Sequence, residues 1–152
     1  MKTTAIKVEG IELIVPDFLV DLWPHHLRLD DFPSFCGAGS GLGDAIVPEK
    51  CWGLVLSPAC FIHDISWLVC EASWAGFHQS NSMFVHNMLA LNSRSRWLLK
   101  QLRAYRIVSY FNAVDTVGAH YFWADKKHAR AADPLAIAGV RSRLDRLGIT
   151  AT

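Results

Sequence analysis

An apolar segment that opens with Ser57-Pro58 and contains the pair His63-Asp64 constrains the fold of this chain more than any other stretch. Serine is a good N-cap, proline suits the first helical position, and Gly76 can end a helix, so the sequence predicts a helix from about Pro58 to about Ala75. Nearly all of its residues are apolar, and a helix that is apolar on all sides is a buried one. The presence of a histidine and an aspartate inside a buried helix requires an explanation, because burial of an unpaired charge costs free energy.

A bound metal ion would be such a reason, because a glycine-rich loop from Phe35 to Gly41 precedes this helix. Glycines tolerate positive φ and let a loop turn its backbone carbonyls inward. A carboxylate that faces such carbonyls makes an all-oxygen site that suits calcium. His63 lies about 100° round the helix from Asp64 and can hold a water molecule beside the metal. General base and calcium together are an arrangement found in hydrolases.

Two motifs in this region resemble the signature of the phospholipase A2 family. Cys36-Gly37-Ala38-Gly39 has the form C-G-x-G of the family's calcium loop, and Cys60-Phe61-Ile62-His63-Asp64 has the form C-x-x-H-D of its catalytic helix. The resemblance implies that His63 activates the attacking water and that the Gly37 amide helps to hold the oxyanion. It implies a disulfide between Cys36 and Cys60. It also implies calcium ligands from the Asp64 carboxylate and from the backbone carbonyls of Phe35, Gly37 and Gly39.

Two positions depart from the family pattern. The family often has a tyrosine four residues after the histidine, where this chain has Trp67. The family's aspartate on a second helix, which holds the histidine ring, has its best match in Asn87, with Asp115 as an alternative. Asparagine can bond the ring but adds no charge, and loss of that charge in an analogous triad costs orders of magnitude in rate. We therefore expect a slow enzyme, or an inactive descendant that uses the fold for another task.

The rest of the sequence predicts a mostly α-helical chain. Lys7 to Val15 is β-rich, with Gly10 as a bulge or bend. A second helix capped by Ser80 or Asn81 is expected to run to about Leu91, and a long third helix from about Ser95 to about Ala131. A short amphipathic helix follows in the tail from Pro134 to Thr152. The expected fold is a phospholipase A2-like helical core with two antiparallel helices, a long third helix and a short N-terminal β element, in a single domain over residues 1–152.

Composition narrows the classes of function. The 152 residues are 51% hydrophobic and 19% charged, which is typical of a globular protein without disorder. The net charge of +1 gives no bulk attraction to nucleic acid or to an anionic membrane. The N-terminal stretch has charges among its apolar residues and no clear cleavage site, so we expect no signal peptide. A cytoplasmic or phage-particle-associated protein is then expected in preference to a classically secreted one.

The chain has four cysteines, at positions 36, 51, 60 and 70. They form no C-x-x-C motif, so a structural zinc site is not expected. Their even number permits a second disulfide between Cys51 and Cys70, although a cytosolic chain would keep its cysteines reduced.

Two functions remain open. The first is calcium-dependent hydrolysis of an acyl ester of a phospholipid, with His63 as general base, Asp64 as calcium ligand and transient contact with a membrane surface. The second is a non-catalytic binding or structural protein on the same scaffold, for example one associated with a phage or prophage. The intact glycine loop and the His63-Asp64 pair favour the first function. Asn87 and the absence of a signal peptide favour the second.

Overall fold

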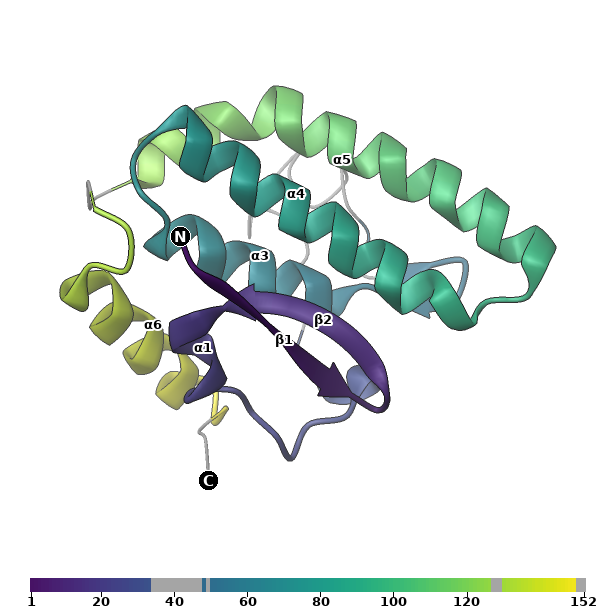
Figure 1. Cartoon of the computed structure of the whole chain (residues 1–152), viewed down its shortest axis with the longest axis horizontal. Coiled ribbons are helices and arrows are strands. Elements are labelled where there is room, and N and C mark those ends of the chain that lie inside the picture. Colours follow the sequence, from purple (N-terminus) through teal and green to yellow (C-terminus); the bar gives the residue numbers. More distant parts are fainter. Residues whose placement is uncertain (34–47, 49, 127–129, 150–152) are drawn as a thin grey trace.

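The computed structural model describes residues 1–33, 48, 50–126 and 130–149. Most of these residues are helical, as the sequence predicts. Three helices form the main body: α3 (Ser57–Val69), α4 (Trp74–Leu91) and α5 (Trp97–Asp125). They alternate in direction, so that α4 runs antiparallel to both neighbours (Figure 1). None of the helices in the described residues is long and apolar enough to cross a membrane.

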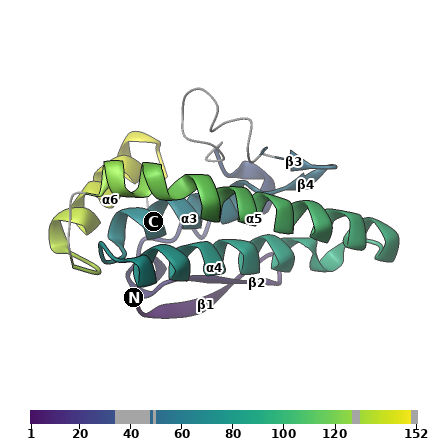
Figure 2. The same cartoon turned by 90° about the horizontal axis from the view of Figure 1, so that it is seen from above.

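A β-hairpin packs against the side of α4 that faces away from α5 (Figure 2). Its strands β1 (Thr3–Val8) and β2 (Ile11–Pro16) pair in antiparallel register, with Val8 opposite Ile11. Glu9 and Gly10 between them both have positive φ, 49° and 78°, which is the backbone of the two-residue hairpin turn that matches strand twist. The bend predicted at Gly10 is therefore confirmed.

Two short elements and a second small hairpin complete the N-terminal half. α1 (Asp17–Val20) follows β2 directly, and the 3-10 helix η1 (Leu29–Asp31) lies against α3. β3 (Lys50–Cys51) and β4 (Leu54–Val55) pair across Trp52 and Gly53, whose φ angles are also positive, at 48° and 80°. This hairpin leads directly into α3.

The boundary between α3 and α4 differs from the predicted one. α3 ends at Val69 and not near Ala75, and α4 begins at Trp74 because the Ser73 hydroxyl accepts a hydrogen bond from the Gly76 amide at 3.0 Å. Gly76, predicted to end a helix, therefore lies in the first turn of the next one. A Cβ atom there would approach the Glu71 carbonyl oxygen to 2.4 Å, so the glycine permits the tight turn.

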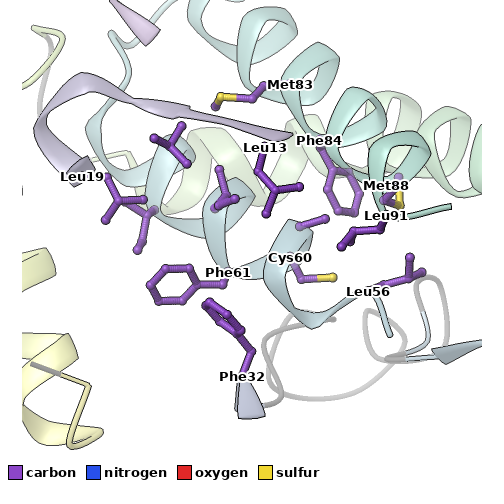
Figure 3. Close-up of a cluster of buried hydrophobic side chains, with 14 of the residues drawn as sticks. Leu13, Leu19, Phe32, Leu56, Cys60, Phe61, Met83, Phe84, Met88 and Leu91 are labelled. Carbon is purple, nitrogen blue, oxygen red and sulfur yellow. The ribbon is translucent and has the colours of Figure 1, made fainter. Parts of the chain in front are cut away.

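α3 is the centre of the hydrophobic core (Figure 3). It is covered by β2 and α4 on one side and by η1 and α6 (Pro134–Arg146) on others. Phe61 packs edge-on against Trp23 and Phe32, with ring centroids 5.8 and 5.4 Å apart. A helix enclosed in this way is apolar on all sides, as its sequence predicts, and its polar side chains must find partners within the protein.

α6 is the amphipathic helix predicted in the tail. Asp133 caps its first turn by accepting a hydrogen bond from the Leu135 amide at 2.9 Å, and Val140 and Leu144 bury its apolar side. Arg143 is only half exposed and points its guanidinium toward α3. This contact brings a positive charge to the helix that carries His63 and Asp64.

Candidate functional site

His63 lies in the middle of α3, with its ring enclosed by two aromatic side chains. The Phe84 ring stacks on it at a centroid distance of 4.4 Å, and the Trp67 ring is tilted against it at 4.5 Å. The side chain of His63 is only 8% exposed, whereas that of Asp64 is 29% exposed. His63 Nδ1 and Asp64 Oδ1 are 4.0 Å apart. The structure therefore brings the two predicted residues together, at a separation too long for a direct hydrogen bond but suited to a bridging water.

The side chain that holds the His63 ring is Asn81 on α4. Its Oδ1 atom lies 2.9 Å from His63 Nε2 and also accepts a hydrogen bond from Trp67 Nε1 at 3.0 Å. Its Nδ2 atom donates to Asp115 Oδ1 on α5 at 2.9 Å. Three helices thus contribute to one hydrogen-bonded chain, which we name the Asn81 relay and define as His63, Asn81 and Asp115.

The neighbours of Asn81 fix the orientation of its amide. The indole N–H of Trp67 can only donate and the carboxylate of Asp115 can only accept, so a flipped amide would clash with both. Because Oδ1 is the atom that faces His63, His63 Nε2 must donate and carry the ring proton. Neutral His63 then has its lone pair on Nδ1, the nitrogen nearer to Asp64.

The prediction that Asn87 holds the His63 ring is wrong. Asn87 is fully buried, and its amide forms two hydrogen bonds with the backbone of Ile14 on β2: Oδ1 accepts from the Ile14 N–H and Nδ2 donates to the Ile14 carbonyl, both at 2.8 Å. Asn87 therefore joins α4 to the N-terminal hairpin. The alternative partner, Asp115, does reach His63, but through Asn81 and not directly.

Burial sets the ionisation of His63. Removal from water lowers the pKa of the imidazole to about 4, and the hydrogen bond with Asn81 offsets only part of this shift. His63 is therefore neutral at neutral pH, in the tautomer with an unprotonated Nδ1. A neutral imidazole with a free nitrogen lone pair beside a carboxylate is the arrangement of a general base.

The carboxyl group of Asp64 has few charged or hydrogen-bonding neighbours among the described residues. Burial raises the pKa of its carboxyl group to about 7, and the charge of Arg143, whose Nη2 lies 3.8 Å from Asp64 Oδ2, offsets part of the rise. No hydrogen bond reaches this carboxylate from the residues that the structure describes. A half-buried carboxylate with open lone pairs fits a ligand of a hard cation. Within the described residues, however, no group of three or more His, Cys, Asp or Glu side chains is placed to hold a metal.

The predicted loop ligands lie outside the described residues. This applies to the carbonyls of Phe35, Gly37 and Gly39, to the Gly37 amide and to Cys36. Cys60, in the first turn of α3, is disulfide-bonded. Cys51 and Cys70 are buried free thiols, so the second disulfide that their sequence positions permitted does not form.

Three other ionisable side chains of this region make their contacts away from the His63 ring. His78 is exposed, and its Nδ1 atom lies 3.1 Å from Asp115 Oδ1, the same oxygen that accepts the hydrogen bond from Asn81. Glu71 accepts a hydrogen bond from the Ser73 hydroxyl in the turn between α3 and α4. His86 is exposed on α4. None of these three side chains is placed to act on a group held between His63 and Asp64.

Sequence reasoning missed Asn81 and Arg143. The sequence predicts Asn81 as a helix cap, whereas it lies about two turns inside α4. Residues at equal distance from the turn of an antiparallel helix pair face each other: His63 is seven residues before Cys70, and Asn81 is eight after Ser73. A helix start at Ser73, signalled by serine before an apolar stretch, would have identified Asn81. Arg143 gave no such signal, because its contact is long-range.

Comparison with known proteins adds no family assignment, since no protein-family model, curated protein or solved structure matches the chain. We therefore infer a function for this chain from its two sequence motifs and from the geometry around His63.

Proposed function

We propose that this protein is a calcium-dependent hydrolase that cleaves an acyl ester of a phospholipid, with His63 as general base. The observation that carries the proposal is the fixed proton position on His63: Asn81 holds the proton on Nε2 and leaves Nδ1 unprotonated beside Asp64. Any buried histidine needs a partner for its ring N–H, but here that partner leaves the second ring nitrogen, Nδ1, unprotonated on the side of Asp64. The two sequence motifs indicate which reaction to propose, namely ester hydrolysis at a calcium site.

His63 Nδ1 takes the proton from a water molecule as that water attacks the ester carbonyl carbon. The proton then passes from Nδ1 to the oxygen of the departing alcohol as the ester C–O bond breaks, which restores the neutral imidazole. Calcium, when held by Asp64 and by the carbonyls of Phe35, Gly37 and Gly39, would supply Lewis-acid stabilisation of negative charge on the carbonyl oxygen. The Gly37 amide is proposed to donate a hydrogen bond to that same oxygen.

The Asn81 relay has two roles in this mechanism. It fixes the ring so that Nδ1 keeps its position, and it stabilises the imidazolium that forms when Nδ1 takes a proton. Asn81 itself is neutral, but its amide is polarised by the carboxylate of Asp115 at 2.9 Å, so part of that negative charge is felt at Nε2. This stabilisation is weaker than direct contact with a carboxylate, and we expect a modest turnover rate.

Fatty-acid release from phospholipid vesicles tests the proposal. Wild-type protein should release fatty acid in calcium and not in EDTA, and His63→Gln should lower the rate by at least about 10²-fold. Asp64→Asn should abolish the calcium dependence, because it removes the only predicted side-chain ligand. His86→Gln is the matched control, since it changes an exposed histidine on α4. Equal rates for His63→Gln and His86→Gln would overturn the proposal.

One observation favours the alternative, a non-catalytic binding or structural protein on this scaffold. The group that holds His63 is a carboxamide and not a carboxylate, and burial makes protonation of the ring unfavourable. The same assay separates the two functions. If properly folded wild-type protein releases no fatty acid in calcium while calcium still raises its melting temperature, the non-catalytic function is the better conclusion.

A further inference from the structure

The first half of α5 carries an apolar surface that faces solvent. Trp97 and Tyr105 are each 75% exposed and Leu98 is 63% exposed, and Leu102 and Val108 lie on the same side of the helix. At about 100° per residue, all five side chains fall within about 140° of the helix circumference, so they share one side of α5. We call it the α5 face and define it as Trp97, Leu98, Leu102, Tyr105 and Val108.

The α5 face is not required for the core. The opposite side of the helix buries Ile107 and Tyr110 toward the rest of the protein. Figure 1 shows α5 at the outer edge of the helical body, beside α4, and Figure 2 shows the β3–β4 hairpin on the side of α5 away from α4. Arg103 ties that hairpin to α5 by donating to the Trp52 carbonyl, and Trp52 at the hairpin turn is also exposed. Large apolar side chains clustered at the surface in this way mark an interaction site.

The charged side chains in the part of the sequence that contains the α5 face are of one sign. No Asp or Glu occurs between Glu71 and Asp115, whereas this stretch contains five cationic side chains: Arg94, Arg96, Lys100, Arg103 and Arg106. Around the helix axis, Lys100 borders one side of the α5 face and Arg106 borders the other. The balanced net charge of the whole chain conceals this local excess. The partner that such a surface favours is therefore anionic as well as apolar.

We propose that the α5 face docks the protein on a membrane surface that contains anionic phospholipid. Trp and Tyr prefer the boundary between headgroups and acyl chains, Leu and Val enter the apolar side, and flanking Lys and Arg reach the lipid phosphates. A second copy of this chain is a poorer partner, because pairing two α5 faces would bring the bordering cations Lys100 and Arg106 of both copies together. The inference rests on the proposed function in that the docked lipid would include the substrate, but docking itself needs neither His63 nor hydrolysis.

Vesicle sedimentation in EDTA tests the docking surface apart from catalysis. Wild-type protein should sediment with vesicles of phosphatidylcholine and phosphatidylglycerol, bind vesicles of phosphatidylcholine alone more weakly, and lose affinity as salt increases. Tyr105→Ala and Trp97→Ala should each weaken binding several-fold. Tyr121→Ala is the matched control, because Tyr121 is an exposed tyrosine in the other half of α5. His63→Gln should bind as the wild type does, whatever its effect on hydrolysis.

Three results would overturn the proposal. Wild-type protein that fails to bind anionic vesicles at low salt would exclude a lipid surface as the partner. Equal loss of binding for Tyr105→Ala and Tyr121→Ala would place the contact elsewhere. A wild-type dimer that Trp97→Ala converts to a monomer, measured by light scattering, would show that a second copy covers the α5 face. Normal melting curves for the variants establish that any loss of binding is local and not a loss of fold.

Discussion

Asn81 on α4 accepts a hydrogen bond from His63 Nε2 on α3 at 2.9 Å, so that a carboxamide stands between the imidazole and the carboxylate of Asp115. The side chain of Asn81 therefore separates the negative charge of Asp115 from the His63 ring that this charge would stabilise. This relationship decides both the tautomer of His63 and the strength of His63 as a base. It also permits a test in which the carboxamide and the carboxylate exchange places.

Asn81→Asp alone should destabilise the protein, because it sets two carboxylates at the 2.9 Å now spanned by the Asn81–Asp115 hydrogen bond. We expect a loss of about 1–3 kcal/mol in the free energy of unfolding, measured by urea denaturation. The double variant Asn81→Asp/Asp115→Asn should recover most of that loss and raise the pKa of His63, because the charge now contacts Nε2 directly. A double variant no more stable than Asn81→Asp would show that the two groups are not coupled.

Asn87→Asp should destabilise the protein without increasing hydrolysis. Its amide now donates to the Ile14 carbonyl, and a carboxylate would face that oxygen with no proton to offer. Loss of this buried hydrogen bond should cost about 2–3 kcal/mol. Denaturation gives the stability and the vesicle assay gives the rate. An increase in fatty-acid release would contradict the structural role assigned to Asn87.

The ionisation of Asp64 should make the stability of the metal-free protein depend on pH. Its pKa is raised to about 7 in the folded state, from an ordinary value of 3.8, so the unfolded state loses this proton first as pH rises. The contribution of Asp64 to stability is then fully present below about pH 4 and is lost between about pH 4 and about pH 7. Relative to wild type, Asp64→Asn should gain stability through this window, by at most about 4 kcal/mol.

Urea denaturation in EDTA at several pH values measures this gain. A difference between wild type and Asp64→Asn that does not change with pH would show that the carboxyl group has an ordinary pKa. Added calcium should reverse the order of the two proteins at neutral pH, because the metal stabilises only the form that keeps its carboxylate ligand.

Two glycine substitutions in helices should have opposite signs. Gly76→Ala places a Cβ 2.4 Å from the Glu71 carbonyl oxygen, a backbone atom that cannot move away cheaply, so a loss of about 1–3 kcal/mol is expected. Gly139→Ala in α6 meets no atom within 4 Å, and alanine is the better helix former, so a gain of about 0.5–1 kcal/mol is expected. Thermal melts of both variants give the comparison. A stabilised Gly76→Ala would mean that the turn between α3 and α4 is looser than described.

The helical character of the chain and the burial of α3 follow from sequence, because a long run of apolar residues after Ser57-Pro58 permits few other structures. The end of α3 does not follow in the same way. Gly76 suggests a stop, but its role depends on a backbone approach to Glu71 that only the folded turn creates. The error of about six residues at this boundary shifted the expected pairing of the two helices.

The candidate site, too, can be predicted from the sequence only in part. His63 and Asp64 are neighbours in sequence, and their proximity needs no tertiary information. The choice between Asn81 and Asn87 depends on the register of α4 against α3, which the turn sets. The contact of Arg143 with Asp64 depends on how α6 packs. The sequence shows the apolar period of α5. It does not show that the side with Trp97 and Tyr105 faces solvent, because periodicity alone does not indicate whether an apolar side is buried or exposed.

The proposed role of His63 requires that its ring is neutral and keeps its proton on Nε2, which leaves Nδ1 unprotonated beside Asp64. Nitrogen-15 NMR of histidine-labelled protein measures this directly, with His63→Gln to assign the signals. The structure predicts a protonated Nε2 and an unprotonated Nδ1 at neutral pH, and no change until the pH falls toward about 4, the pKa of the buried ring. A proton on Nδ1 at neutral pH, in the other tautomer or in an imidazolium ion, would contradict the assignment of His63 as the general base.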